Sequence, residues 1–367
     1  MSRNNANQVT SGNYSVIAGG VNNRVTGNNC FAGAGASLVN SGASGGIVAG
    51  TSNTISSGTN TFIGAGEANT ISANYATIAG GQSNTASASH SFIGGGQGNT
   101  ASGGQYNVVC GGSSNTCSGA NANNFLGGGT TNSVSGGQDA VCVGGRSNSV
   151  SGSYAFIAAG RNNTASGDSA MLLSKFSQAS GSFSSILGGQ ENTASGAYSS
   201  VIASYQGQAE LHSQIVHSAG QFSTRGDAQA HELVWRRAIT GTAITELFLN
   251  GASAAAILPT TNSVWHGTIE IVAICTNAGG GTTIVGDVAA ASYLTTIKRI
   301  GANTALVGGV QQIGVTNADA SMNTSVFTID ANNTNESLRI QFTAPATADA
   351  TTEIRVVATF RGTQIKY

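Results

Sequence analysis

The chain has 367 residues, with 53 glycines, only 2 prolines, 8% charged residues and a formal net charge of −1. It contains no run of about 20 apolar residues, which a membrane-spanning helix requires. Disorder is excluded as well, because 40% of the residues are apolar and the net charge is close to zero. A near-neutral chain gives no electrostatic reason to bind nucleic acid or an anionic membrane. We therefore expect no nucleic-acid partner and no membrane insertion.

The first residues, "MSRNNANQVTSG", lack the apolar stretch of a secretory signal peptide, so we expect assembly in the cytoplasm of a host cell, or export by a non-standard route. The cysteines are odd in number and form no CxxC pair, which indicates neither a zinc site nor a disulfide framework. We expect them to serve as small buried apolar residues. The five are Cys30, Cys110, Cys117, Cys142 and Cys275.

A short motif recurs along the first part of the chain, as "NQVTSG" at Asn7, "NTASG" at Asn99 and "NSVSG" at Asn148. Successive copies lie 15 to 17 residues apart, and two gaps of about twice that length contain degenerate copies. About 14 copies fill residues 7–222. A fixed period of this kind is the signature of a repeat architecture, in which each unit packs on its neighbours.

Each copy has two halves, "N-T-[AIV]-S-G" and "Y-S-x-I-x-G-G", and both alternate polar with apolar residues before a glycine. Such alternation predicts two short strands and two turns per copy. Recurrent glycine among β-branched and hydroxyl residues excludes helices. The pattern predicts a parallel β-roll, or β-solenoid, of about 14 flat coils.

Alternation also assigns the faces of the strands. The apolar residue of the first half points inward together with its asparagine. We expect the asparagine amides to form a hydrogen-bonded ladder, because an unsatisfied buried amide costs about 1–3 kcal/mol. The inward residues of the first strand are Val9, Val25, Ile55, Ile71, Ala86, Ala101, Cys117, Val134, Val150, Ala165 and Ala194. The second strand contributes Ile17, Ile63, Ile78, Ile93, Val109, Leu126, Ile157 and Ile202 to the same core.

Aromatic residues stand three positions before the core residue of the second strand in many copies. Counted by alternation, they lie on the face opposite the core. Exposed rings on a thin roll can contact a carbohydrate or pack against another copy of the chain, and we favour packing against another copy. These residues are Tyr14, Tyr75, His90, Tyr106 and Tyr154.

The repeat stops near Arg225, where charged residues become commoner and both tryptophans appear. Strand-like segments follow, among them "HELVWRRAIT", "TELFLNG", "GTIEIVAIC", "SYLTTIKRI", "SVFTIDA", "SLRIQFTA" and "TEIRVVATF". Seven or more such strands predict an antiparallel β-sandwich. We expect residues 1–224 to form a β-roll shaft and residues 225–367 a C-terminal β-sandwich for trimerisation, receptor binding or both.

The repeat, read as "S-x-A-x-G / S-x-I-x-G", resembles the head repeats of trimeric autotransporter adhesins, in which three parallel β-rolls pack side by side. The signal peptide, heptad stalk and membrane anchor of that family are not found in this sequence. The run "GDAQAHELVWRRAITGTAITELFLNG", followed by "VWHGTIEIVAIC", is similar to the C-terminal domains of bacteriophage tail fibres and tailspikes. The resemblance implies a homotrimer whose C-terminal domain assists trimerisation or recognises the host.

Candidate chemistry is sparse. Glycoside cleavage normally uses two carboxylates about 5–10 Å apart, and the acidic residues of the repeat fall in different coils and slots. We expect the acidic residues of the later strands to be solvent-exposed on a sheet. We expect the two histidines of a degenerate coil to have a structural or solvent-facing role. We therefore predict no catalytic residue, no cofactor and no metal ligand. The residues weighed are Glu67, Asp139, Asp168, Glu191, Glu210, Glu232, Glu246, Glu270, His212 and His217.

The sequence as a whole predicts a homotrimeric, non-enzymatic phage tail-fibre or receptor-binding protein of the virion, which attaches to the bacterial host. Its expected partners are further copies of itself, other phage tail proteins, and a host cell-surface glycan or outer-membrane component. The receptor-binding residues are unknown, although surface aromatics near Trp265 are candidates. The alternatives are a bacterial trimeric surface adhesin, a glycan-cleaving tailspike, and an ice-binding surface built from the outward "T-x-S" hydroxyls.

Overall fold

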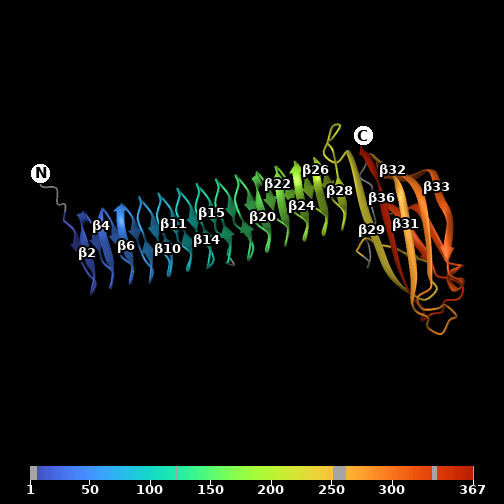
Figure 1. Ribbon diagram of the computed structural model, residues 1–367, viewed down its shortest axis with the longest axis horizontal. Helices are drawn as coiled ribbons and strands as arrows, with labels where there is room; N and C mark the ends of the chain where they lie inside the picture. The colour runs from blue at the N-terminus through green and yellow to red at the C-terminus, as the bar shows by residue number, and fades with distance from the viewer. Residues whose placement is uncertain (1–5, 121–122, 251–261, 333–336, 367) are drawn as a thin grey trace. The chain divides into compact units, whose positions relative to one another are not determined.

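The computed structural model describes residues 6–120, 123–250, 262–332 and 337–366. It forms two compact units, Met1–Ser184 (unit 1) and Ser185–Tyr367 (unit 2). The described chain is all-β: about 14 turns of parallel β-solenoid are followed in sequence by antiparallel strands (Figure 1). The predicted fold class is thereby confirmed. The helices of these residues amount to one 3₁₀ turn, η1 (Ala320–Met322), and none is long and apolar enough to cross a membrane.

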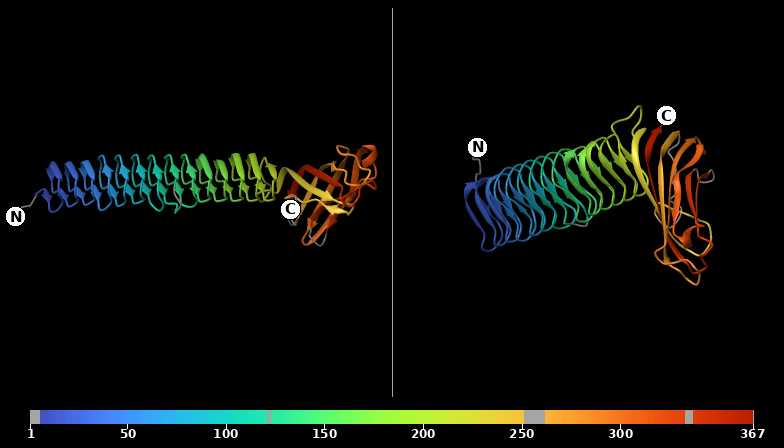
Figure 2. Two further views of the ribbon diagram at one scale, coloured as in Figure 1. Left: turned by 90° about the horizontal axis from the view of Figure 1, so that it is seen from below. Right: turned by 45° about the vertical axis from the view of Figure 1, so that its right-hand side comes forward.

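The coils of unit 1 place two parallel sheets back to back, and Figure 2 shows their strands repeating coil after coil. Pairing is in register, so that Thr85 lies opposite Thr100, and Ile78 lies opposite Ile93. The first sheet contains β1 (Gln8–Val9), β3 (Arg24–Val25), β5 (Val39–Asn40), β7 (Thr54–Ile55), β9 (Thr70–Ile71), β11 (Thr85–Ala86), β13 (Thr100–Ala101), β15 (Thr116–Cys117), β17 (Ser133–Val134), β19 (Ser149–Val150), β21 (Thr164–Ala165) and β23 (Gln178–Ala179). The second contains β2 (Val16–Val21), β4 (Phe31–Ala36), β6 (Gly46–Thr51), β8 (Phe62–Ile63), β10 (Thr77–Ile78), β12 (Phe92–Ile93), β14 (Val108–Val109), β16 (Phe125–Leu126), β18 (Val141–Cys142), β20 (Phe156–Arg161) and β22 (Met171–Lys175).

The predicted core of the coils is confirmed with three exceptions: Ile17 is only half-buried, and Val9 and Ile202 are exposed. From Val25 to Ala194, every residue assigned inward in the first strand is fully buried. Val9 is exposed because it lies in β1, the terminal strand of its sheet. Assigning Ile202 to the core was wrong: it is exposed, and Val201 is buried in its place. The in-register pairing of β26 with β24 explains this, because it sets Val201 opposite the buried Ile186.

The asparagine ladder is present and bonds mainly to the main chain. The Oδ1 atom of Asn84 accepts a hydrogen bond from the amide of Asn99 at 2.9 Å. Its Nδ2 group donates to the carbonyl oxygens of Gly80 and Gly96, both at 3.1 Å. The side-chain amide of Asn84 therefore hydrogen-bonds to the main chain of two turns and to the residue before the next strand of the first sheet. This explains why a buried asparagine recurs in the coils.

Glycine at the second turn is required by the close approach of successive coils. Gly81 has φ +91°, and a Cβ built on it would stand 2.2 Å from the carbonyl oxygen of Gly96. No side chain fits at that distance, and the left-handed conformation itself favours glycine.

Unit 2 begins with the last coils and continues into an antiparallel sheet in the order β28-β29-β36-β31-β32-β33. A three-stranded sheet, β30-β35-β34, accompanies it. The strands are β24 (Ser185–Gln190), β25 (Thr193–Ala194), β26 (Ser200–Tyr205), β27 (Gln208–Ala209), β28 (Ile215–His217), β29 (Ala228–Thr240), β30 (Thr245–Glu246), β31 (Ser263–Asn277), β32 (Val288–Ile300), β33 (Asn303–Ala318), β34 (Val326–Asn332), β35 (Ser337–Thr343) and β36 (Glu353–Lys366).

The seven expected C-terminal segments fall on strands, although "TELFLNG" is reduced to the two residues of β30 and its last residue, Gly251, lies outside the described residues. Strand β33 was not predicted. Its pairing with β32 contains irregular steps, and Gly308, Gly309 and Gly314 have positive φ. Such bulges interrupt the two-residue alternation by which strands are recognised.

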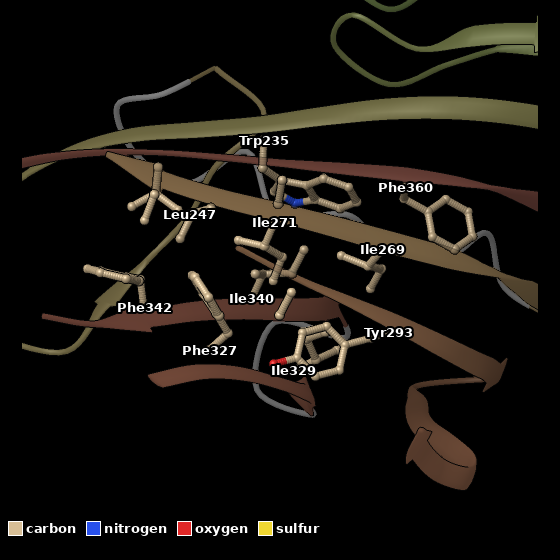
Figure 3. Close-up of a cluster of buried hydrophobic side chains, with 14 of the residues drawn as sticks. Trp235, Leu247, Ile269, Ile271, Tyr293, Phe327, Ile329, Ile340, Phe342 and Phe360 are labelled. Atoms are coloured by element: carbon tan, nitrogen blue, oxygen red, sulfur yellow. The ribbon is translucent and has the colours of Figure 1, made fainter. Parts of the chain in front are cut away.

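The core of the sandwich lies between its two sheets (Figure 3). Leu338, Ile340 and Phe342 of β35 are buried on one face, as predicted. The expectation of surface aromatics near Trp265 was wrong. Trp265 is only 1% exposed, and its ring contacts the buried rings of His231 and Phe360. Long alternating strands favour the burial of such large rings between the sheets.

Candidate binding surfaces

The aromatic ladder residues lie in turns. Tyr75, His90 and Tyr106 have φ between 55° and 59°. Counting by alternation therefore does not apply to them, because the adjoining strand of the second sheet begins two residues later. They are exposed at one corner of the coil. Asparagine, serine and aspartate occupy this left-handed position in other coils, as their side chains tolerate it best.

Three consecutive rings form what we call the aromatic stack: Tyr75, His90 and Tyr106. The ring centroids of Tyr75 and His90 are 4.6 Å apart with an interplanar angle of 14°, and those of His90 and Tyr106 are 4.8 Å apart. This spacing is that of neighbouring strands, about 4.8 Å, so the coil repeat itself sets the stack. Main-chain bonds fix it: the His90 amide donates to Asn74 O at 3.0 Å.

The stack is bordered by polar groups. The amide of Asn123 donates from Nδ2 to Oδ1 of Asp139 at 2.9 Å, continuing the same ladder position beyond Tyr106. A surface groove of about 520 Å³ beside Tyr106 is lined by Ser87, Ser89 and Gln105 among others. Because the rings stack on one another, they present their edges outward, next to the hydroxyl and amide groups of the groove.

A second exposed surface, the apolar stripe, was not predicted. It consists of the two residues that flank the core residue in each strand of the second sheet, which alternation turns outward. Phe62 and Phe92 are 42% and 40% exposed. Each ring lies against the glycine two positions later: a Cβ on Gly64 or Gly94 would stand 3.6 or 3.5 Å from the ring. Large and small side chains thus complement each other along the strand.

The stripe extends through unit 1 with apolar residues of varied size. Its exposed members are Val16, Phe31, Val48, Phe62, Phe92, Val143, Met171 and Leu173. The signal was present in the sequence, in the "TFIG", "SFIG" and "AFIAAG" segments, where the residue before the core isoleucine is aromatic. An exposed row of apolar residues of this kind is a candidate interaction surface.

The acidic residues weighed for catalysis lie apart from one another or have basic and amide partners. Gln82 donates to Glu67 at 3.1 Å, Arg361 donates to Glu232 at 3.0 Å, and Gln206 donates to Glu191 at 2.9 Å. Among the residues that the structure describes, no group of three or more His, Cys, Asp or Glu side chains could hold a metal ion.

Four of the five cysteines are buried, as expected. Burial raises the pKa of the Cys117 thiol to about 12 and that of Cys142 to about 11, so both remain protonated. Cys110 is exposed, contrary to expectation, because it follows the core residue Val109 and faces outward on the apolar stripe.

No protein-family model matches the sequence, and no curated protein matches it. Among solved structures, the tailspike protein of Acinetobacter phage vB_ApiP_P1 is similar, with 10% identity and a TM-score of 0.26 over 96% of this chain and 74% of that one. The tailspike protein of Acinetobacter baumannii phage AM24 is similar with 8% identity and a TM-score of 0.23, over 98% of this chain and 69% of that one.

These matches correct one prediction. Both structures are tailspike proteins, a class that typically degrades glycans. The prediction of a protein without enzymatic activity is contradicted by this comparison, which does not itself show an activity of this chain. It rested on the dispersal of acidic residues over the repeat, and that dispersal does not exclude cleavage by residues elsewhere in the chain.

Proposed function

We propose that this chain is a phage tail-associated protein that binds glycans of the host surface through its aromatic stack. The single observation that carries the proposal is the continuous row of exposed rings of Tyr75, His90 and Tyr106, 4.6 and 4.8 Å apart, beside a polar groove. Pyranose rings present apolar C–H faces of similar size to an aromatic ring. Neighbouring amides and hydroxyls supply the polar contacts that fix orientation.

The protein acts as a homotrimer in this proposal. The apolar stripe supports self-association, because a second copy offers the same stripe with the same coil repeat. Three copies rather than two follow from the resemblance to trimeric adhesin heads. Three identical stacks held on one rod convert weak single-site binding into useful avidity.

Residues 1–224 form the shaft and residues 225–367 the C-terminal sandwich of this assembly, which is a component of the virion. Its partners are two further copies, other phage tail proteins, and a host cell-surface glycan or outer-membrane component.

The test compares the variant Tyr75→Ala/Tyr106→Ala with the matched control Tyr14→Ala/Tyr154→Ala. The control removes two exposed tyrosines from the same ladder position, and neither ring contacts another ring among the described residues. Binding is measured on an array of bacterial O-antigen and capsular oligosaccharides, and the bound oligosaccharides are then sized for cleavage. We expect the stack variant to lose at least tenfold in affinity and the control to lose little. Equal binding by both variants would overturn the proposal.

A further inference from the structure

Unit 2 contains a groove with an unusual concentration of arginine. Two adjoining cavities, of about 380 and 550 Å³, share the residues Arg236 and Asn250. The smaller is also lined by Arg237 and Arg355, and the larger by Tyr198 and His212. Each volume lies within the range of small-molecule sites. We call the two cavities together the arginine groove.

The sheet register brings two of these arginines together. Strands β29 and β36 are antiparallel, with Arg236 opposite Val357 and Ala238 opposite Arg355. Arg236 and Arg355 are therefore diagonal neighbours on the exposed face, with Cβ atoms about 7 Å apart. Two like charges at this separation repel each other, so the arrangement favours an anion placed between them.

Neither charge has a carboxylate partner in the described part of the chain. Across the described residues, the guanidinium groups of Arg236 and Arg355 make no ion pair and no hydrogen bond, whereas Arg339 pairs with Asp330 and Arg361 pairs with Glu232. Two arginines of the same domain thus have carboxylate partners, and the two in the groove do not.

The third arginine is held in place. Nη1 of Arg237 donates to the carbonyl oxygen of Glu246 at 3.1 Å, and its guanidinium carbon lies 5.1 Å from the ring centroid of Phe248. These contacts occupy the guanidinium of Arg237, and alternation turns this side chain away from the exposed face, so the pair available to an anion is Arg236 and Arg355.

The other end of the groove is aromatic. The rings of Tyr198 and His212 meet edge to face, with centroids 5.2 Å apart. Burial and the charge of Arg236 both lower the pKa of His212, so this ring is neutral at physiological pH. The groove therefore joins an uncharged aromatic wall to a cluster of cations.

We infer that the arginine groove binds an acidic saccharide, with a sugar carboxylate between Arg236 and Arg355 and the sugar ring against Tyr198 and His212. Guanidinium groups bind carboxylates through paired hydrogen bonds, and a neutral sugar leaves the two unpaired charges without a partner. Nucleic acid is disfavoured because it requires a longer basic surface. The inference rests on the proposed glycan-binding function and names the substrate class at a second site.

The test uses the full-length protein with three carboxylated polymers, oligogalacturonate, alginate and hyaluronate, and with dextran as the neutral polymer. Affinity is measured by titration calorimetry for the wild type, Arg236→Gln/Arg355→Gln, and the matched control Arg24→Gln/Arg146→Gln. The control removes two exposed arginines from unit 1. We expect at least one carboxylated polymer to bind, with affinity at least tenfold weaker in the groove variant and unchanged in the control.

Three outcomes would overturn the inference: no binding of any carboxylated polymer, equal losses in both variants, or competition by inorganic phosphate as strong as that by galacturonate monomer. The last would show an anion site without sugar recognition. These failures are distinguishable from failure of the proposed function, because the aromatic stack lies in unit 1 and its variants are scored on neutral as well as acidic oligosaccharides.

Discussion

The side-chain oxygen of Asn84 accepts a hydrogen bond from the main-chain amide of Asn99, one coil further along, at 2.9 Å. The same bond recurs between Asn99 and Asn115 at 3.0 Å. Each coil therefore positions the first strand of the next through a buried amide. This side-chain ladder adds to the main-chain bonds between coils, such as the bond from the Thr85 amide to the carbonyl oxygen of Asn99 at 2.8 Å.

Asn84→Ala should destabilise unit 1 by about 1–3 kcal/mol, because it leaves the buried main-chain amide of Asn99 without a hydrogen-bond partner. Thr85→Ala, at a half-buried outward position of β11, is the control and should cost under about 1 kcal/mol. Chemical denaturation monitored by circular dichroism gives both values. Similar losses for the two variants would contradict the role assigned to the ladder.

Gly81→Ala should prevent normal stacking of its coil. The new Cβ would stand 2.2 Å from the oxygen of Gly96 at a φ of +91°, and both the clash and the left-handed backbone oppose it. Gly46→Ala is the matched control, since its Cβ would meet only the ring of Phe62, at 3.5 Å. We expect a fall in the thermal midpoint for the first variant and little change for the second.

Phe62→Glu/Phe92→Glu should dissociate the proposed trimer without unfolding its chains, because the apolar stripe faces outward. Light scattering on a sizing column should then report the 36.4 kDa chain in place of about three times that mass. Thr85→Glu/Thr100→Glu places the same charges outside the first sheet and should leave the trimer intact. A wild-type protein that runs as a monomer would contradict this prediction at the outset.

Acid should destabilise unit 2 through His231. Burial lowers the pKa of this histidine from 6.5 to about 3, so the folded protein holds it neutral while the unfolded chain protonates it. The stability it contributes is complete above pH 6.5 and is lost progressively as the pH falls toward 3. At pH 5 the loss is about 2 kcal/mol relative to pH 7.5.

His231→Phe should reduce this acid sensitivity, whereas His266→Phe, at an exposed histidine, should not. The measurement is the free energy of unfolding at pH 7.5 and pH 5 for all three proteins. Because carboxylates also titrate in this range, the informative quantity is the difference between each variant and the wild type. Identical pH dependence in wild type and His231→Phe would show that His231 is not the sensor.

Much of the solenoid was predictable because its rules are local. The repeat places an inward residue at a fixed position in each coil, and burial of Ile78 and Ile93 follows from alternation alone. Ile202 shows where that reasoning fails. In "SSVIAS" both Val201 and Ile202 are apolar, and only the pairing of β26 with β24 decides which of them enters the core.

The candidate sites were less accessible to sequence reasoning. The aromatic ladder was identified, yet its placement in left-handed turns, and the contact of Tyr75 with His90, depend on the spacing of adjacent coils. The arginine groove could not be recognised from a sequence motif, because Arg236 and Arg355 are more than a hundred residues apart in sequence. They become neighbours only through the register of β29 with β36.

By itself, then, the sequence determined the all-β class, the coil period, the inward asparagine ladder and the change of architecture after the last coil. These follow from short-range periodicity and from the cost of burying an unpaired amide. The tertiary structure decided the register of degenerate coils, the burial of Trp265, the outward apolar stripe as a continuous surface, and the meeting of distant arginines. Those depend on strand pairing between remote segments, which the alternation within any one segment does not specify.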